Sequence, residues 1–146
     1  MVMRVDDLAS RNNKGSPELI MHCDANFSPG GERSRSGVVL TINGMVIHWA
    51  SNKQSITAAS KCEAEAVACA LGMKLGISLR ALLEELTGSS PQLVMVNDNK
   101  AALIIITTQI TSWRNHHYAY RAAWVRDWVH EAGVRLRHQK GDCLSE

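Results

Sequence analysis

The sequence lacks the features of several protein classes. No run of apolar residues approaches the ~18–20 that a membrane-spanning helix needs, and residues 1–15 have no apolar stretch like that of a signal peptide. The four cysteines form no CxxC pair, so we expect reduced thiols in an intracellular protein rather than disulfides or a zinc site. A net charge of only +2 excludes nucleic-acid binding through overall charge, so any such binding needs a local patch.

The length and composition of the chain are those of one globular domain. The 146 residues are 45% hydrophobic and 21% charged, which suffices for a single core. We interpret residues 1–18, which are rich in polar residues, as an N-terminal tether or linker, and residues 19–146 as the domain itself. Internal repeats and low-complexity tracts are absent.

Three strands are expected early in the domain, at 19–27, 36–42 and 45–51. Asn43-Gly44, between the second and third, is the strongest short hairpin signal. These strands should therefore form an antiparallel meander. A buried strand at 93–98 and a last strand at 134–139 follow.

A long amphipathic helix should follow the meander. Ser60 is the expected N-cap, with Glu63 completing a capping box. Apolar residues then recur at spacings of three and four from position 67 to position 86, which predicts a buried stripe. Gly88 and Pro91 should end the helix. Gly72 and Gly76 either weaken this helix or allow close approach of another backbone.

Two shorter helices are expected at 99–108 and 113–132, with Trp124 and Trp128 of the second assigned to the core. The order β-β-β-α-β-α-α-β predicts an α/β fold. Its five-stranded mixed sheet has three antiparallel strands, then two parallel additions, and is flanked by helices.

Four acidic residues lie at the edges of these predicted elements. Asp24 lies in the first strand, Glu65 opens the long helix, Asp98 ends the fourth strand and Asp142 follows the last one. Carboxylates are costly to bury unless something compensates their charge. Their recurrence at distant points of the chain indicates a shared cation.

Some of these assignments have alternatives. Glu63 and Glu65 lie on opposite edges of the apolar stripe, so at ~3.6 residues per turn the helical wheel does not choose between them. Asp98 could be the N-cap of the following helix, and Asp142 a solvated tail residue. His138 is interpreted as an exposed strand residue.

A series of short motifs from about residue 21 to the end resembles a known family. They are Asp24-Ala25, Ser36-Gly37, residues 49–54, residues 61–66, Asn97-Asp98-Asn99, residues 114–117 with 121, and residues 140–146. In this order and spacing they resemble the ribonuclease H domain of copia-type LTR-retrotransposon polyproteins, within the ribonuclease H-like superfamily. That family has Cys-Asp-Asn where this chain has Asn97-Asp98-Asn99.

The resemblance implies hydrolysis of the RNA strand of RNA–DNA hybrids with two Mg²⁺ ions, or Mn²⁺. It implies that Asp24 bridges both ions, with Glu65 and Asp98 on one side and Asp142 on the other, and it favours Glu65 over Glu63. Carboxylates are the ligands that Mg²⁺ prefers, and paired cations suit phosphodiester hydrolysis.

Further residues are candidates for contact with the hybrid through its phosphates, although a solvated loop or helix face would also explain them. They are Arg33, Arg35, Asn99, Arg114, His117 and Arg121.

The chain departs from the family in ways that concern activity. The basic protrusion of cellular ribonucleases H is absent, so a fused reverse transcriptase is expected to supply substrate affinity. Ala66 and Ala119 replace a Tyr and an Asp. The sequence ends four residues beyond Asp142, so a ligand there is poorly preorganised unless the chain is a shortened piece. An active enzyme is expected in the cell, in a cytoplasmic particle or the nucleus. The alternative is a catalytically impaired, domesticated copy that acts as a binding or scaffold module.

Overall fold

A computed structural model describes residues 17–28, 30–55, 57–58, 60–107 and 116–139, without the side chains of residues 105 and 116–121. Its elements are β1 (Glu18–Asn26), β2 (Arg35–Ile42), β3 (Met45–Lys53), α2 (Lys61–Thr87), β4 (Gln92–Asn97), α3 (Lys100–Thr107), α4 (His116–Ala132) and β5 (Arg135–His138). This succession confirms the predicted order of strands and helices. Most of the tether expected at 1–18 lies outside the described residues, as do residues 113–115 of the last predicted helix.

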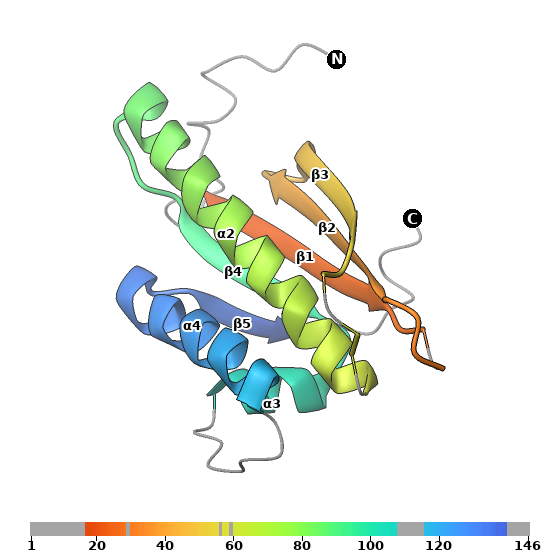
Figure 1. Cartoon of the computed structure of the whole chain (residues 1–146). Helices are drawn as coiled ribbons and strands as arrows, with labels where there is room; N and C mark the ends of the chain where they lie inside the picture. The colour runs from red at the N-terminus through yellow and green to blue at the C-terminus, as the bar shows by residue number, and fades with distance from the viewer. Residues whose placement is uncertain (1–16, 29, 56, 59, 108–115, 140–146) are drawn as a thin grey trace.

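The five strands form one mixed sheet in the order β3-β2-β1-β4-β5 (Figure 1). β1, β2 and β3 are antiparallel neighbours, whereas β4 runs parallel to β1 and β5 parallel to β4. The hairpin between β2 and β3 turns at Asn43 (φ 50) and Gly44 (φ 79), the two left-handed residues that a type I′ turn requires. The predicted sheet is therefore confirmed.

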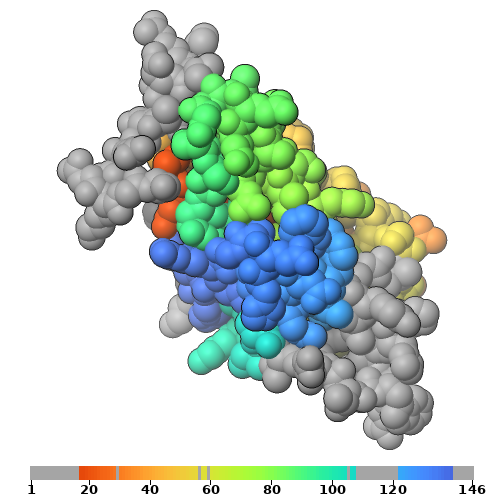
Figure 2. Space-filling model, turned by 90° about the vertical axis from the view of Figure 1, so that its left-hand side faces the viewer, coloured from red at the N-terminus to blue at the C-terminus, as the bar shows by residue number. Residues whose placement is uncertain are grey.

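The helices α2 and α4 lie side by side on one face of the sheet (Figures 1 and 2). Leu19, Met21 and Cys23 of β1 are fully buried in the core that α2 covers, because alternate strand residues point to the same face. By length and composition α2 could cross a membrane, but its burial against the sheet already accounts for its apolar character.

Both ends of α2 follow the sequence signals. The Ser60 hydroxyl accepts a hydrogen bond from the Glu63 backbone N–H at 3.1 Å, as an N-cap does. At the other end Gly88 adopts the left-handed conformation (φ 72) and its N–H donates to the Glu84 carbonyl at 2.9 Å.

The predicted stripe of α2 is confirmed in part. Ala64, Ala68 and Leu83 are buried, and Leu71, Leu75 and Leu79 pack, partly buried, against the core. The prediction was wrong for Leu82 and Leu86, which are 50% and 53% exposed. The fully buried face also includes one acid and several small residues; the buried residues of α2 are Ala64, Glu65, Ala66, Ala68, Cys69, Gly72, Met73, Gly76 and Leu83.

Gly72 and Gly76 explain this orientation, because both lie against β1. A Cβ on Gly72 would collide with Cys23 Sγ, and one on Gly76 with Met21 Sδ. Of the two interpretations of these glycines, the structure supports close approach, here of the helix backbone to the Cys23 and Met21 side chains.

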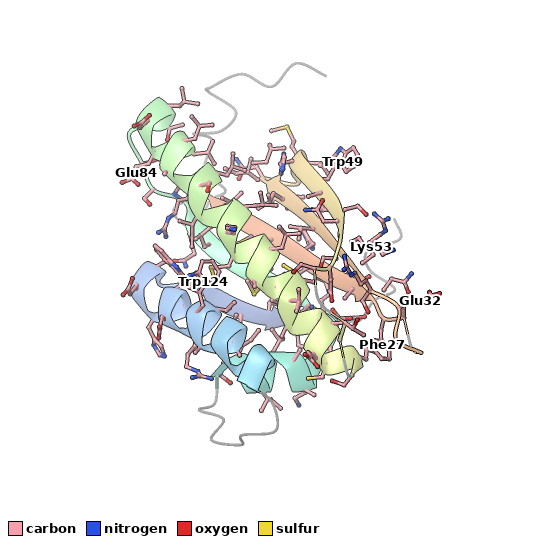
Figure 3. All side chains as sticks on the ribbon, viewed as in Figure 1. Phe27, Glu32, Trp49, Lys53, Glu84 and Trp124 are labelled. Atoms are coloured by element: carbon pink, nitrogen blue, oxygen red, sulfur yellow. The ribbon has the colours of Figure 1, made fainter. Side chains whose placement is uncertain are left out.

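The two tryptophans of α4 differ. Trp128 packs against the core as predicted, whereas Trp124 is 38% exposed, so its assignment to the core was wrong. Their rings make an edge-to-face pair, with centroids 6.4 Å apart. Trp49, on the edge strand β3, is 70% exposed and projects from the sheet (Figure 3).

We predict that Gly72→Ala lowers the free energy of unfolding by roughly 1–3 kcal/mol, the usual cost of overpacking a core. At an exposed helical position the same change should stabilise by up to about 1 kcal/mol. Removing the colliding atom with Cys23→Ala should make the double variant less destabilised than the two single effects added together. Urea unfolding of the four proteins tests this, and additive effects would contradict the contact.

Candidate metal centre

Three of the four predicted acidic residues meet at one edge of the sheet. Asp24 lies near the end of β1 and Asp98 directly follows β4, and because these strands are adjacent and parallel, their carboxyl ends coincide. Glu65 reaches the same edge from the beginning of α2. One carboxylate oxygen from each lies within 4.8 Å of the others.

The cluster is buried on one side and open on the other. Glu65 is fully buried and Asp98 half-buried, whereas Asp24 is exposed. Glu65 Oε1 and Asp98 Oδ1 are buried and accept no hydrogen bond from the described part of the chain. Buried carboxylate oxygens without a partner are costly, so their presence fits a hard cation that they would ligate.

The electrostatics of Glu65 reflect this crowding. Burial raises the pKa of Glu65 to about 7. The hydrogen bond from the Asn97 amide lowers this pKa, the charges of Asp24 and Asp98 raise it, and the charge of Lys61 lowers it. Without a cation, the Glu65 carboxyl therefore holds a proton below about neutral pH.

The thiols behind the cluster are not ligand candidates. The neighbouring Cys23 thiol and burial hold the pKa of Cys69 well above its ordinary value, so Cys69 stays a thiol rather than a thiolate. Cys23, Cys62 and Cys69 take part in no disulfide, and Cys143 lies outside the described residues.

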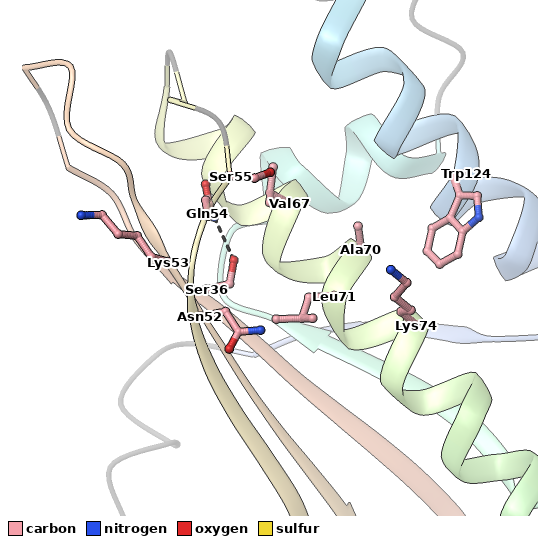
Figure 4. Close-up of a pocket in the computed structure, with 10 residues that line it drawn as sticks. All are labelled: Ser36, Asn52, Lys53, Gln54, Ser55, Val67, Ala70, Leu71, Lys74 and Trp124. Carbon is pink, nitrogen blue, oxygen red and sulfur yellow. Dashed lines mark hydrogen bonds between the residues drawn. The ribbon is translucent and has the colours of Figure 1, made fainter.

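Gln54 fixes the beginning of α2, a role that the sequence analysis missed. Its buried Nε2 donates at 2.9 Å to Ser36 Oγ and at 2.9 Å to the carbonyl of Ala64, the residue before Glu65 (Figure 4). The end of β3 is thereby joined to the turn that carries the acid. Gln54 also lines an open groove of about 530 Å³, whose far side is formed by Lys74 and Trp124.

The turn after β4 presents Asp98 to the cluster. Asn99 Oδ1 accepts the Ala102 N–H at 3.0 Å, so Asn99 caps α3 and the alternative that Asp98 does so was wrong. His138 is exposed on β5, as expected, and its Nε2 lies 2.9 Å from the Asp98 carbonyl oxygen.

The structure describes only some of the remaining predicted site residues. Glu63 is partly buried, and its backbone N–H donates to the Ser60 hydroxyl at 3.1 Å. Arg33 is exposed, and Arg35 Nη1 lies 3.4 Å from the Ser51 carbonyl oxygen. Asp142 and Arg114 lie outside the described residues, as do the side chains of His117 and Arg121. The ligand and substrate roles of all these residues stay predictions.

Known proteins resemble this chain in sequence. No family model matches it. The Gag-Pol polyproteins of the Saccharomyces cerevisiae transposons Ty1-JR2 and Ty1-ER2 are each 30% identical to it over 124 residues. The match covers 82% of this chain but 7% of each polyprotein, so the chain spans a small part of these relatives.

Solved structures resemble it in fold. RNase H1 from Halobacterium salinarum NRC-1 has a TM-score of 0.64 at 12% identity, covering 88% of this chain and 89% of that one. LC11-RNase H1, isolated from compost, has a TM-score of 0.66 at 16% identity, covering 88% of each chain. Its complex with an RNA/DNA hybrid has a TM-score of 0.61 at 15% identity, covering 86% of this chain and 87% of that one. At these identities the likeness establishes the fold.

We predict that Glu65 makes the metal-free protein less stable as the pH rises from 5 to 8. In the unfolded chain Glu65 loses its proton near 4.5, whereas in the folded protein it keeps it to about 7. Between these values the folded state binds more protons, so its stability falls with rising pH. Glu65→Gln should remove this dependence. Urea unfolding in the presence of a chelator tests it; a parent-minus-variant difference that is constant with pH would contradict it.

Proposed function

We propose that this chain, a ribonuclease H-like domain related to retrotransposon Gag-Pol polyproteins, hydrolyses the RNA strand of RNA–DNA hybrids in a reaction that depends on divalent metal ions. The observation that carries the proposal is the convergence of Asp24, Glu65 and Asp98, whose carboxylate oxygens lie within 4.8 Å of one another. A solved structure of similar fold is a complex with an RNA/DNA hybrid, which supports the choice of substrate.

The residues at the cluster suit Mg²⁺ or Mn²⁺. All three offer hard oxygen ligands, and two of those oxygens are buried without a partner in the described chain. A pair of such ions, when bound, would make a water nucleophilic and stabilise the leaving oxygen of the scissile phosphate. Asp24, the exposed member, would hold the ions on the side of the cluster that is open to solvent and therefore to a substrate phosphate.

The protein's own contribution to the reaction is to hold the carboxylate ligands in fixed positions. Gln54 secures the turn before Glu65 through the Ala64 carbonyl, and the cap at Asn99 orients the turn that bears Asp98. Ligands held in this way need little reorganisation when a substrate phosphate binds. Asp142 would complete the set from the C-terminal segment.

Contacts with the hybrid would come from the predicted basic and polar residues, which are Arg33, Arg35, Asn99, Arg114, His117 and Arg121. Because the related proteins are Gag-Pol polyproteins, we assign the chain a fused or associated reverse transcriptase as its partner in the cell.

We predict that the protein cleaves a labelled RNA–DNA hybrid with Mg²⁺ or Mn²⁺, and that Asp24→Asn and Asp98→Asn each lower kcat by more than about a hundredfold. Loss of a metal ligand should exceed the ~10–100-fold cost of losing an outer partner. Asp127→Asn, at an exposed position of α4, is the matched control and should leave the rate unchanged.

A gel assay with hybrid, duplex RNA and duplex DNA tests the prediction, together with melting temperature measured with and without Mg²⁺. If the parent neither cleaves the hybrid nor is stabilised by either metal, the enzyme proposal fails. A domesticated binding module would then explain the retained fold.

A further inference from the structure

Asn97, the last residue of β4, is an almost fully buried amide in the middle of the acidic cluster; its exposed fraction is 1%. Its Nδ2 donates to Glu65 Oε2 at 3.0 Å and to the Cys23 carbonyl at 2.9 Å. Its Oδ1 accepts the Asn99 backbone N–H at 2.7 Å. Cys69 Sγ lies 3.6 Å from Nδ2.

The orientation of this amide is determined by its partners. If the amide were flipped, Oδ1 would face two acceptors, Glu65 Oε2 and the Cys23 carbonyl. The NH₂ group would then face the Asn99 N–H, which is itself a donor. Only the observed orientation satisfies every group, so both hydrogens and the oxygen of Asn97 have defined roles.

These three bonds reach the three elements that carry the acids. The Cys23 carbonyl belongs to the residue before Asp24, Glu65 is bonded directly, and the Asn99 N–H lies just beyond Asp98. A single buried side chain therefore links β1, α2 and the turn after β4.

We propose that Asn97 is a positioning residue of the metal centre, which holds the Glu65 carboxylate and the Asp98 turn at the spacing that a divalent cation requires. The inference rests on the proposed function, since it concerns the same site. Partners behind a ligand fix its orientation, and their loss typically costs ~10–100-fold in metal affinity or activity.

The residue type is specific to this role. Leucine has a similar volume but would leave Glu65 Oε2, the Cys23 carbonyl and the Asn99 N–H without their partner. Cysteine at the same position would offer one weak donor. The amide of Asn97 thus bonds to all three elements, whereas a thiol at the same position would not make these three bonds.

The test compares Asn97→Leu and Asn97→Cys with the parent. Gln92→Leu is the matched control, because the Gln92 amide lies at the other end of β4 from the cluster and its Nε2 donates to the Gly133 carbonyl at 2.5 Å. Mg²⁺ affinity is measured by calorimetry without substrate, and kcat and KM with hybrid; circular dichroism establishes the folded fraction.

The expected result is a tenfold to hundredfold loss of Mg²⁺ affinity and of kcat in Asn97→Leu, a smaller loss in Asn97→Cys, and little change in KM. Gln92→Leu should lower stability without changing either quantity. If Asn97→Leu does not fold, the less disruptive Asn97→Cys decides the outcome.

Two results would overturn the inference, and they differ in what else they overturn. If the parent binds Mg²⁺ and cleaves while a folded Asn97 variant matches it in affinity and kcat, Asn97 is structural only and the proposed function stands. If the parent itself neither binds Mg²⁺ nor cleaves, the metal centre and the role of Asn97 fail together.

Discussion

The close contact between α2 and β1 is the constraint on which the site depends. Residues 65, 69, 72 and 76 follow one another at spacings of four and three, so they share one helical face. Because Gly72 and Gly76 have no side chain, that face lies directly against Cys23 and Met21. Glu65 belongs to the same face and is carried to the end of β1, beside Asp24. The packing of small residues, rather than attraction between charges, brings the acid into the protein.

This arrangement has a cost, since three carboxylates share one edge of the sheet and one of them is buried. The raised pKa of Glu65 measures that cost, because the carboxyl holds its proton where an ordinary glutamate would be charged. The Asn97 amide offsets part of it by donating to Oε2. Within the described part of the chain Glu65 Oε1 and Asp98 Oδ1 have no hydrogen-bond partner, and a divalent cation would stabilise both.

The sequence predicted the elements better than their mutual orientation. Asn43-Gly44, Ser60 and Gly88 act through local backbone chemistry, so their signals could be read directly. The leucine stripe was only partly right, because a helical wheel weights hydrophobicity, whereas α2 comes closest to the sheet at its glycines. The roles of Asn97 and Gln54 could not be predicted for another reason. The role of a buried amide depends on hydrogen-bond partners that are distant in the chain. Polar residues at strand ends are also too common for the sequence to distinguish one of them.

The fold also bears on how a substrate would be held. The acidic centre would repel phosphates until cations bind, and the net charge is only +2. We therefore propose that affinity for the hybrid comes mainly from the polymerase part of a polyprotein like those the chain resembles. Tethering by a short linker gives an effective concentration on the order of millimolar. A weak site then suffices, provided its acids are rigidly placed, and the buried bonds of Gln54 and Asn97 serve that placement.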